Sequence, residues 1–214
     1  MKELGRKIIF DSPKEILDPD HTALVIWNAQ NGFVQRTYNS LEFEQNIKSL
    51  LWSARMARVR VVYSRHTELD IDFQHPWAVY LEMVRRRLTE PDRLQLLFQP
   101  GTGDSDIHES VEPAVNDIIL NIRSDSLFYG SQFDSMMRAA GITTVVFSGV
   151  GTETGLENSV REASVRGYYT VVCKECVTTY DRNAQEISLK NMENVALVYP
   201  LNEILNHWKG SKKG

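Results

Sequence analysis

The sequence predicts an α/β fold: a three-layer αβα domain with a parallel sheet of six strands. Apolar runs of strand length alternate with helical patterns along the 214 residues. Most of these runs are almost entirely apolar, which is typical of strands covered on both faces. Strands and helices alternating at this spacing imply parallel strands joined by right-handed crossovers. With no internal repeat and no low-complexity linker, the chain is expected to form one domain over residues 1–214.

Each predicted strand is a short apolar run bounded by polar or turn-forming residues. The six strands are expected at Ala23–Trp27, Val59–Ser64, Asp117–Asn121, Thr143–Ser148, Tyr169–Cys173 and Ala196–Tyr199. Helical periodicity falls between them, near Leu41–Arg58, Trp77–Leu88, Gln132–Ala140, Glu153–Arg166, Ala184–Asn194 and Leu201–Trp208. Gly141, Gly167 and Pro200 stand at element boundaries, as helix-ending and turn residues do. The stretch from His66 to Pro113 is the least regular and is expected to fold over one end of the sheet.

The composition limits the classes of partner and compartment. A net charge of −4 and a pI near 5.8 do not favour a nucleic-acid-binding surface. The basic clusters Arg85–Arg87 and Lys209–Lys213 are interpreted as a solvated helix end and a frayed tail. Without an apolar signal core, a membrane-length apolar run or a cysteine framework, the protein is expected to be cytoplasmic, with no membrane partner.

Two cysteines form the only Cys-x-x-Cys pair, at Cys173 and Cys176. Such a pair can be a redox site or half of a zinc site. Here it lies within the strand-like run Tyr168–Val177 rather than at a helix start, and no second pair exists. We therefore favour two thiols in or beside a buried strand.

Ligands of parallel α/β sheets bind beyond the carboxyl ends of the strands. The segments that follow the predicted strands are Asn28–Phe33, Ser64–His66, Ile122–Phe128 and Gly149–Gly155. Four segments resemble, in the same order, four motifs of the isochorismatase-like (cysteine hydrolase) superfamily. They are Thr22–Phe33, Arg123–Gly130, Ser148–Glu157 and Ala163–Glu175. The resemblance runs from about Thr22 to Leu201 and implies the isochorismatase-like hydrolase fold.

The resemblance implies a catalytic set of Asp, Lys and Cys, in which Cys attacks a carbonyl or nitrile carbon and Asp is its base. At the matching positions this chain has Asn28, Ile122 and Gly155. An amide cannot take up a proton as a carboxylate does, and glycine has no nucleophile. Isochorismatases proper also resemble this chain in having Gly at the cysteine position, but their mechanism needs a protonatable acid.

Two classes of function therefore stay open. The first is a non-catalytic family member that binds a small carboxylate or carbonyl compound. The second is an active hydrolase of a small amide or ether with a non-covalent mechanism. The discriminating feature is a protonatable group that faces the pocket between Asn28 and Gly155, for which the candidates are Asp125, Glu153 and His66, with Arg123 as a substitute cation.

The residues expected to bind the ligand come from the same strand ends. They are Gln30, Phe33, Arg123, Phe128, Val150, Gly151, Thr152 and Thr154. Thr152 is alternatively a donor to the backbone at the strand-to-helix elbow. Trp27, Phe33, Phe128 and Tyr129 form either an apolar pocket wall or part of the core, with Trp27 favoured as core. The resemblance further implies a cis peptide at Val150–Gly151.

No metal and no cofactor are expected. His66 and His75 flank Asp70 and Asp72, but this spacing does not match the metal motif of the resembling nicotinamidases, and solvated loop residues are the favoured interpretation. The resemblance implies a homo-oligomer, either a dimer or a tetramer, whose partner is otherwise a small molecule.

Overall fold

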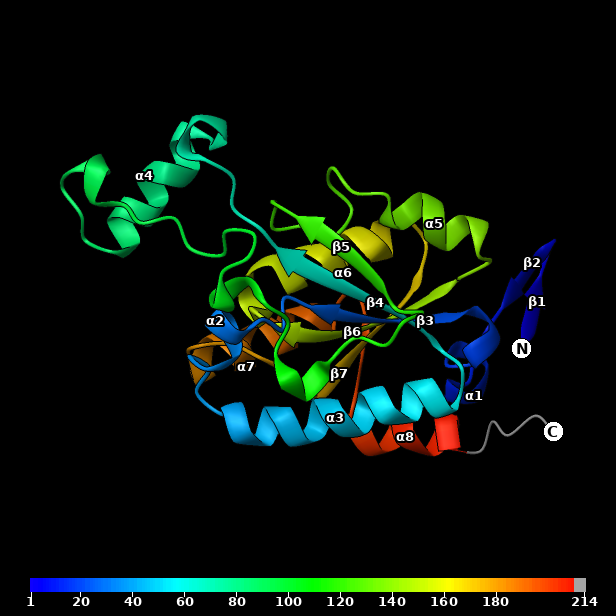
Figure 1. Ribbon diagram of the computed structural model, residues 1–214. Helices are drawn as coiled ribbons and strands as arrows, with labels where there is room; N and C mark the ends of the chain where they lie inside the picture. Colours follow the sequence, from blue (N-terminus) through cyan, green and yellow to red (C-terminus); the bar gives the residue numbers. More distant parts are fainter. Residues whose placement is uncertain (210–214) are drawn as a thin grey trace.

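A six-stranded parallel sheet forms the centre of the computed structural model, which describes residues 1–209 (Figure 1). The strands lie in the order β5-β4-β3-β6-β7-β8, and every neighbouring pair is parallel. Their bounds are β3 Thr22–Trp27, β4 Arg60–His66, β5 Ile118–Ile122, β6 Thr144–Val150, β7 Tyr169–Thr178 and β8 Leu197–Tyr199. The predicted fold class and all six predicted strands are confirmed.

Helices cover both faces of this sheet and complete three layers (Figure 1). The α3 (Ser40–Met56) and α8 (Leu201–Lys209) helices lie on one face. On the other face lie α5 (Phe133–Ala139), α6 (Glu157–Val165) and α7 (Arg182–Met192). Successive residues of β3 pack into the cores on opposite faces of the sheet, because side chains of a strand alternate between its faces. Ile26 packs toward α3, and Val25 and Trp27 pack toward α6.

Four short elements in the first part of the chain were not predicted. The β1 (Lys2–Leu4) and β2 (Lys7–Ile9) strands form an antiparallel hairpin that stands apart from the sheet (Figure 1). The short α1 helix (Pro13–Ile16) follows it, and α2 (Asn31–Val34) comes directly after β3. At the other end, α8 ends at Lys209, so most of the basic cluster Lys209–Lys213 lies outside the described residues.

The irregular segment between β4 and β5 behaves differently in its two halves. Its second half lies on the body, where Phe98 and Val111 are buried. Its first half carries α4 (Pro76–Arg85), which projects away from the body (Figure 1) and has no buried residue. The second half therefore packs on the body, as expected, whereas the first half has no buried residue in its helix.

The two cysteines lie in β7, as predicted, and both are fully buried and free. The register of β7 against β6 shifts between Phe147 and Gly149, which places Cys173 and Cys176 in an irregular stretch of the strand. Burial raises the pKa of the Cys176 thiol well above its ordinary value. Among the described residues, no helix combines the length and apolar character needed to cross a membrane.

Candidate functional site

The carboxyl ends of β3, β4, β5 and β6 open onto a cavity of about 630 Å³, at the edge of the sheet where a ligand was expected. The projecting α4 helix and the segment after it form the opposite wall. The lining residues include Trp27, Asn28, Phe33, Arg36, His66, Glu68, Trp77, Glu82, Phe98, Arg123, Asp125, Val150, Gly151, Glu153, Thr154 and Tyr180. Aromatic rings and charged groups therefore share this cavity.

Asn28 is held at the end of β3 in a left-handed backbone conformation, with φ of 46°. Asparagine tolerates this conformation better than most residues. The Ser64 hydroxyl donates to Asn28 Oδ1 at 2.8 Å, and the Asn28 N–H donates to the Ser64 hydroxyl at 3.0 Å. The amide is nearly buried and lines the cavity.

Gly155 lies in a strand-to-helix elbow whose π-helical turn, Thr152–Leu156, leads into α6. A Cβ added to Gly155 would lie 2.3 Å from Cζ2 of Trp27 and 3.0 Å from its Cε2. Real Cβ atoms do not approach a ring so closely, so the indole occupies the space of a side chain at this position. Trp27 is 1% exposed, as its assignment to the core predicted, and Gly155 does not line the cavity.

The predicted cis peptide at Val150–Gly151 is wrong. No cis peptide bond occurs in the described residues. The chain turns instead at Gly149 and Gly151, whose φ values are 124° and 88°. Glycine adopts these values readily, whereas residues with a side chain rarely do. The Gly151 N–H donates to the Thr178 carbonyl at 2.8 Å, and the Thr154 N–H donates to the Gly151 carbonyl at 3.2 Å. These two elbow donors are therefore already bonded within the protein.

Ile122, the residue predicted to match the family's lysine, is 3% exposed and belongs to the core on the α6 side of the sheet. Its carbonyl accepts a hydrogen bond from the Thr67 N–H at 3.0 Å. The side chain does not line the cavity. Arg123, the next residue, does line it and makes no hydrogen bond or ion pair with the described part of the chain.

The residues predicted to bind the ligand divide into two groups. Phe33, Arg123, Val150, Gly151 and Thr154 line the cavity, whereas Gln30, Phe128 and Thr152 do not. The Gln30 amide is fully buried, since its Nε2 donates to the carbonyls of His66 and Ser105 and its Oε1 accepts from the His66 N–H.

Thr152 and Phe128 have structural surroundings that explain their absence from the cavity. The Thr152 hydroxyl donates to the Thr178 carbonyl at 3.0 Å, which was the alternative interpretation of this residue. The Phe128 ring packs edge-on against Phe133 beneath the Arg166 guanidinium. Tyr129, a proposed wall residue, is largely exposed and does not line the cavity.

All three candidate protonatable groups, His66, Asp125 and Glu153, line the cavity. Glu153 Oε1 accepts a hydrogen bond from the Thr179 hydroxyl at 2.9 Å. The His66 ring meets the rings of Phe33 and Phe98 edge-on, and those two rings stack with centroids 4.0 Å apart. Among the described residues, no three His, Cys, Asp or Glu side chains group together as metal ligands would.

Arg36, Phe98, Trp77 and Tyr180 also line the cavity and were not singled out from the sequence. Each stands several residues beyond a strand end or within the irregular segment. The sequence carries no local signal for these residues, and even the left-handed φ of 57° at Phe98 is visible only in the structure.

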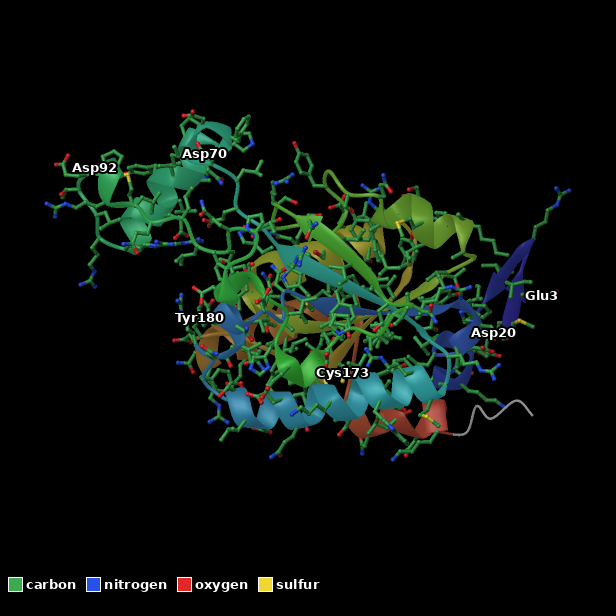
Figure 2. The ribbon with its side chains drawn as sticks, in the orientation of Figure 1. Glu3, Asp20, Asp70, Asp92, Cys173 and Tyr180 are labelled. Atoms are coloured by element: carbon green, nitrogen blue, oxygen red, sulfur yellow. The ribbon has the colours of Figure 1, made fainter. Side chains whose placement is uncertain are left out.

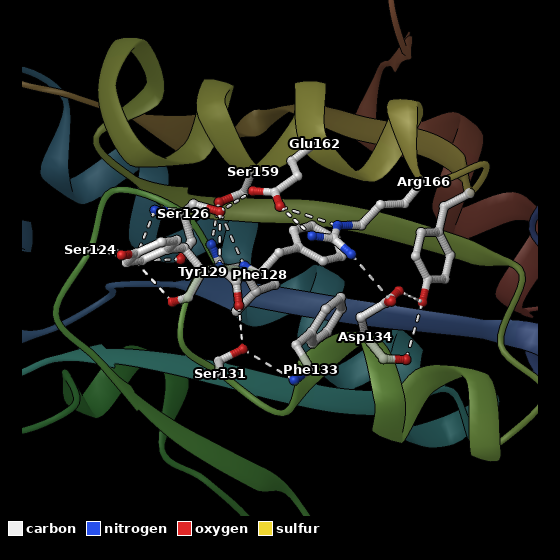
Figure 3. Close-up of polar contacts among 12 residues, drawn as sticks. Ser124, Ser126, Phe128, Tyr129, Ser131, Phe133, Asp134, Ser159, Glu162 and Arg166 are labelled. Carbon is white, nitrogen blue, oxygen red and sulfur yellow. Dashed lines mark hydrogen bonds and ion pairs between the residues drawn. The ribbon is translucent and has the colours of Figure 1, made fainter.

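The loop that carries Arg123 and Asp125 is fixed to α6 by a polar network (Figure 3). The Ser126 hydroxyl donates to Glu162 and accepts from the Phe128 N–H at 3.1 Å. Ser159 of α6 accepts from the Leu127 N–H at 2.9 Å and donates to the Gly155 carbonyl at 2.7 Å. The same helix therefore positions both the elbow and the loop that face the cavity.

Comparison with known proteins identifies the family of this chain. The family model described as "Isochorismatase domain" matches residues 22–202. The chain belongs to the isochorismatase family. A relative named "Ureidoacrylate amidohydrolase RutB" from Methylorubrum extorquens is 30% identical over 196 residues, covering 82% of this chain and 77% of the relative. A protein of the same name from Serratia proteamaculans is 27% identical with the same coverage.

Solved structures of the isochorismatase family share the fold. A cysteine hydrolase from Pseudomonas syringae superposes with a TM-score of 0.79 at 20% identity, covering 97% of this chain and all of the other. An N-carbamoylsarcosine amidase from Thermoplasma acidophilum superposes with a TM-score of 0.68 at 21% identity, covering 85% and 96%. At these identities the likeness establishes the fold.

Proposed function

We propose that this isochorismatase-family hydrolase homologue binds a small carboxylate or carbonyl compound in its cavity and has little or no cysteine-type hydrolysis. The observation that carries the proposal is the Trp27 indole, which lies where a side chain at position 155 would have to stand. A covalent mechanism needs a nucleophile that reaches the substrate. Here the matching position has neither a side chain nor room for one.

The other two family positions support the same conclusion. The Asn28 amide accepts a hydrogen bond from Ser64 and has no carboxylate to act as base. Ile122 is enclosed by apolar core residues, where a lysine ammonium would be costly. The two thiols of the chain, Cys173 and Cys176, are fully buried in β7 and do not line the cavity.

The cavity has groups that suit a small acid or carbonyl compound. Arg123 and Arg36 line it, and neither guanidinium makes an ion pair or hydrogen bond with the described residues. A guanidinium binds a carboxylate through two parallel hydrogen bonds. The stacked rings of Phe33 and Phe98 supply an apolar wall beside these cations.

The alternative function is a non-covalent hydrolase of a small amide or ether. The observation that favours it is the position of Glu153 and Asp125, whose carboxylates line the same cavity as Asn28. A carboxylate there is a candidate general base for a water molecule. The RutB relatives carry an amidohydrolase name, so ureidoacrylate belongs in the substrate panel.

The test combines turnover with binding. We expect no enzymatic turnover of ureidoacrylate, N-carbamoylsarcosine, nicotinamide or isochorismate, and a thermal shift with small carboxylates. The Arg123→Ala variant should lose that shift, whereas Arg60→Ala should keep it, because Arg60 lies at the opposite end of β4. Turnover that Glu153→Gln or Asp125→Asn abolishes would overturn the proposal in favour of the alternative.

A further inference from the structure

The first half of the β4–β5 connection forms an arm, defined here as residues 70–96, that stands off the body of the protein. Figures 1 and 2 show it projecting from the sheet, with Asp70 and Asp92 on the arm and Tyr180 on the body. The cavity lies between the arm and the body, because residues of both line it. The chemistry of these two walls indicates which part of a ligand each one meets.

The wall that the arm supplies contains aliphatic side chains. Four of them line the cavity and are half-buried: Val79 and Leu81 of α4, and Leu94 and Leu96 of the segment that follows it. Tyr80, the residue between the first two, is 58% exposed and does not line the cavity. The arm therefore directs aliphatic surface into the cavity, and a ligand there would remove that surface from water.

The charged side chains of this wall are bonded within the arm itself. Glu82 accepts hydrogen bonds from Arg85 Nη1 at 2.9 Å and from Arg86 Nε at 3.2 Å. Arg86 Nη1 also donates to the Gln95 carbonyl at 2.8 Å, which ties the helix to the segment that returns to the body. These charges hold the arm together, so its aliphatic side chains are the groups left for a ligand.

The wall that the body supplies offers cations instead. Arg123 and Arg36 line the cavity, and within residues 1–209 neither guanidinium has a hydrogen bond or an ion pair. Of the carboxylates on this wall, Glu68 and Glu153 each accept a hydrogen bond from the protein, and Asp125 lies in the same loop as Arg123. A guanidinium without a protein partner is suited to bind the carboxylate of a ligand.

We propose that the cavity takes an amphiphilic carboxylic acid, with its carboxylate at Arg123 and an unbranched alkyl tail along the aliphatic side chains of the arm. This inference rests on the proposed function and narrows its ligand class. The cavity of about 630 Å³ lies within the range of roughly 300–1,000 Å³ that encloses a drug-sized molecule. An acid as short as acetate would leave the aliphatic wall of the arm in contact with water.

Isothermal titration calorimetry with butyrate, hexanoate, octanoate and decanoate tests the tail site. The affinity should rise about two- to fourfold for each added CH₂ group until the tail fills the cavity, because each group leaves water for an apolar wall. Octylamine has a comparable tail and the opposite charge, and it should bind about tenfold or more weakly than octanoate.

The outcomes of this titration separate the two proposals. Equal affinities of all four acids would overturn the tail site and leave the carboxylate site of the proposed function standing. No binding by any acid would overturn both. Octylamine that binds as tightly as octanoate would show that the guanidinium groups do not select the ligand, and the amphiphilic acid would be the wrong class.

Variants of the arm then locate the tail. Leu81→Asn should lower the octanoate affinity about tenfold and so flatten the gain with chain length, because a polar amide replaces buried aliphatic surface. Leu94→Asn repeats the test outside the helix, where a disturbed α4 cannot explain the loss. Tyr80→Asn is the matched control, since Tyr80 is on the same helix but does not line the cavity, and it should bind octanoate as the wild type does. The proposal fails if both leucine variants bind octanoate normally, or if Tyr80→Asn loses as much affinity as they do.

Discussion

At the scale of single residues, the contact between Trp27 and Gly155 determines how much space a side chain at the elbow would have. Trp27 is the last residue of β3, and its ring is enclosed by the core on the α6 side. The ring has room there because Gly155 has no side chain. The two positions are 128 residues apart in the sequence, yet position 155 cannot gain a side chain unless the ring at position 27 shrinks or moves.

Gly155→Ala should lower the free energy of unfolding by about 1–3 kcal/mol, because the new Cβ overlaps the indole. Denaturant unfolding measures this loss. The double variant Gly155→Ala/Trp27→Phe should be less damaged than the sum of the two single variants, since the smaller ring leaves room. Strict additivity would show that the overlap is relieved elsewhere.

Rebuilding the family's catalytic set should fail while Trp27 is present. A chain with Asn28→Asp, Ile122→Lys and Gly155→Cys places a thiol against the indole and an ammonium in the core. We expect no amide hydrolysis from it, measured as ammonia release from nicotinamide and ureidoacrylate. Turnover by this triple variant would contradict the steric argument.

At the scale of elements, α6 determines where the cavity loops lie. Burial raises the pKa of Glu162, but hydrogen bonds from Ser126 and Arg166 outweigh it and lower the pKa below its ordinary value. A carboxylate with a lowered folded pKa contributes stability above the unfolded pKa and loses it as pH falls through the folded one. The anchor of the loop is therefore strongest near neutral pH.

Glu162→Gln should accordingly destabilise the protein at pH 7 by about 0.5–1 kcal/mol, a modest value because the side chain is about a third exposed. The difference from wild type should shrink as the pH falls through the lowered pKa of the folded state, because the wild-type carboxyl is then protonated in both the folded and the unfolded state. Thermal denaturation across pH measures it, with the exposed Glu193→Gln as control. A difference that is independent of pH would rule out the charged hydrogen bonds as its cause.

The sequence predicted the strands well and the loops poorly, for a physical reason. A buried parallel strand such as Thr22–Trp27 is apolar at every position, and this pattern is local. The site depends on pairings between distant residues, such as the Gln30 amide with His66 and Ser105. A motif predicts that Gln30 lies near the site, but not that its hydrogen bonds are already taken.

At the scale of the whole molecule, the sheet isolates both thiols from solvent. Cys173 and Cys176 lie beneath the α3 and α8 layer and are fully buried. The native protein should therefore resist a thiol reagent, and both cysteines should react once denaturant unfolds it. Absorbance of the released chromophore follows the reaction, and Tyr80→Cys supplies a rapidly reacting reference. Fast labelling of the native chain would show that β7 opens locally.

The indole over Gly155 also constrains the order in which such a chain can change over generations. A side chain gained first at 155 meets the ring and overpacks the core. A smaller residue gained first at 27 leaves a cavity, which a tolerant fold survives at a cost of a few kcal/mol. Descent toward a nucleophile at this elbow must therefore change position 27 first, whereas descent away from one must lose the side chain at 155 before a tryptophan can enter at 27.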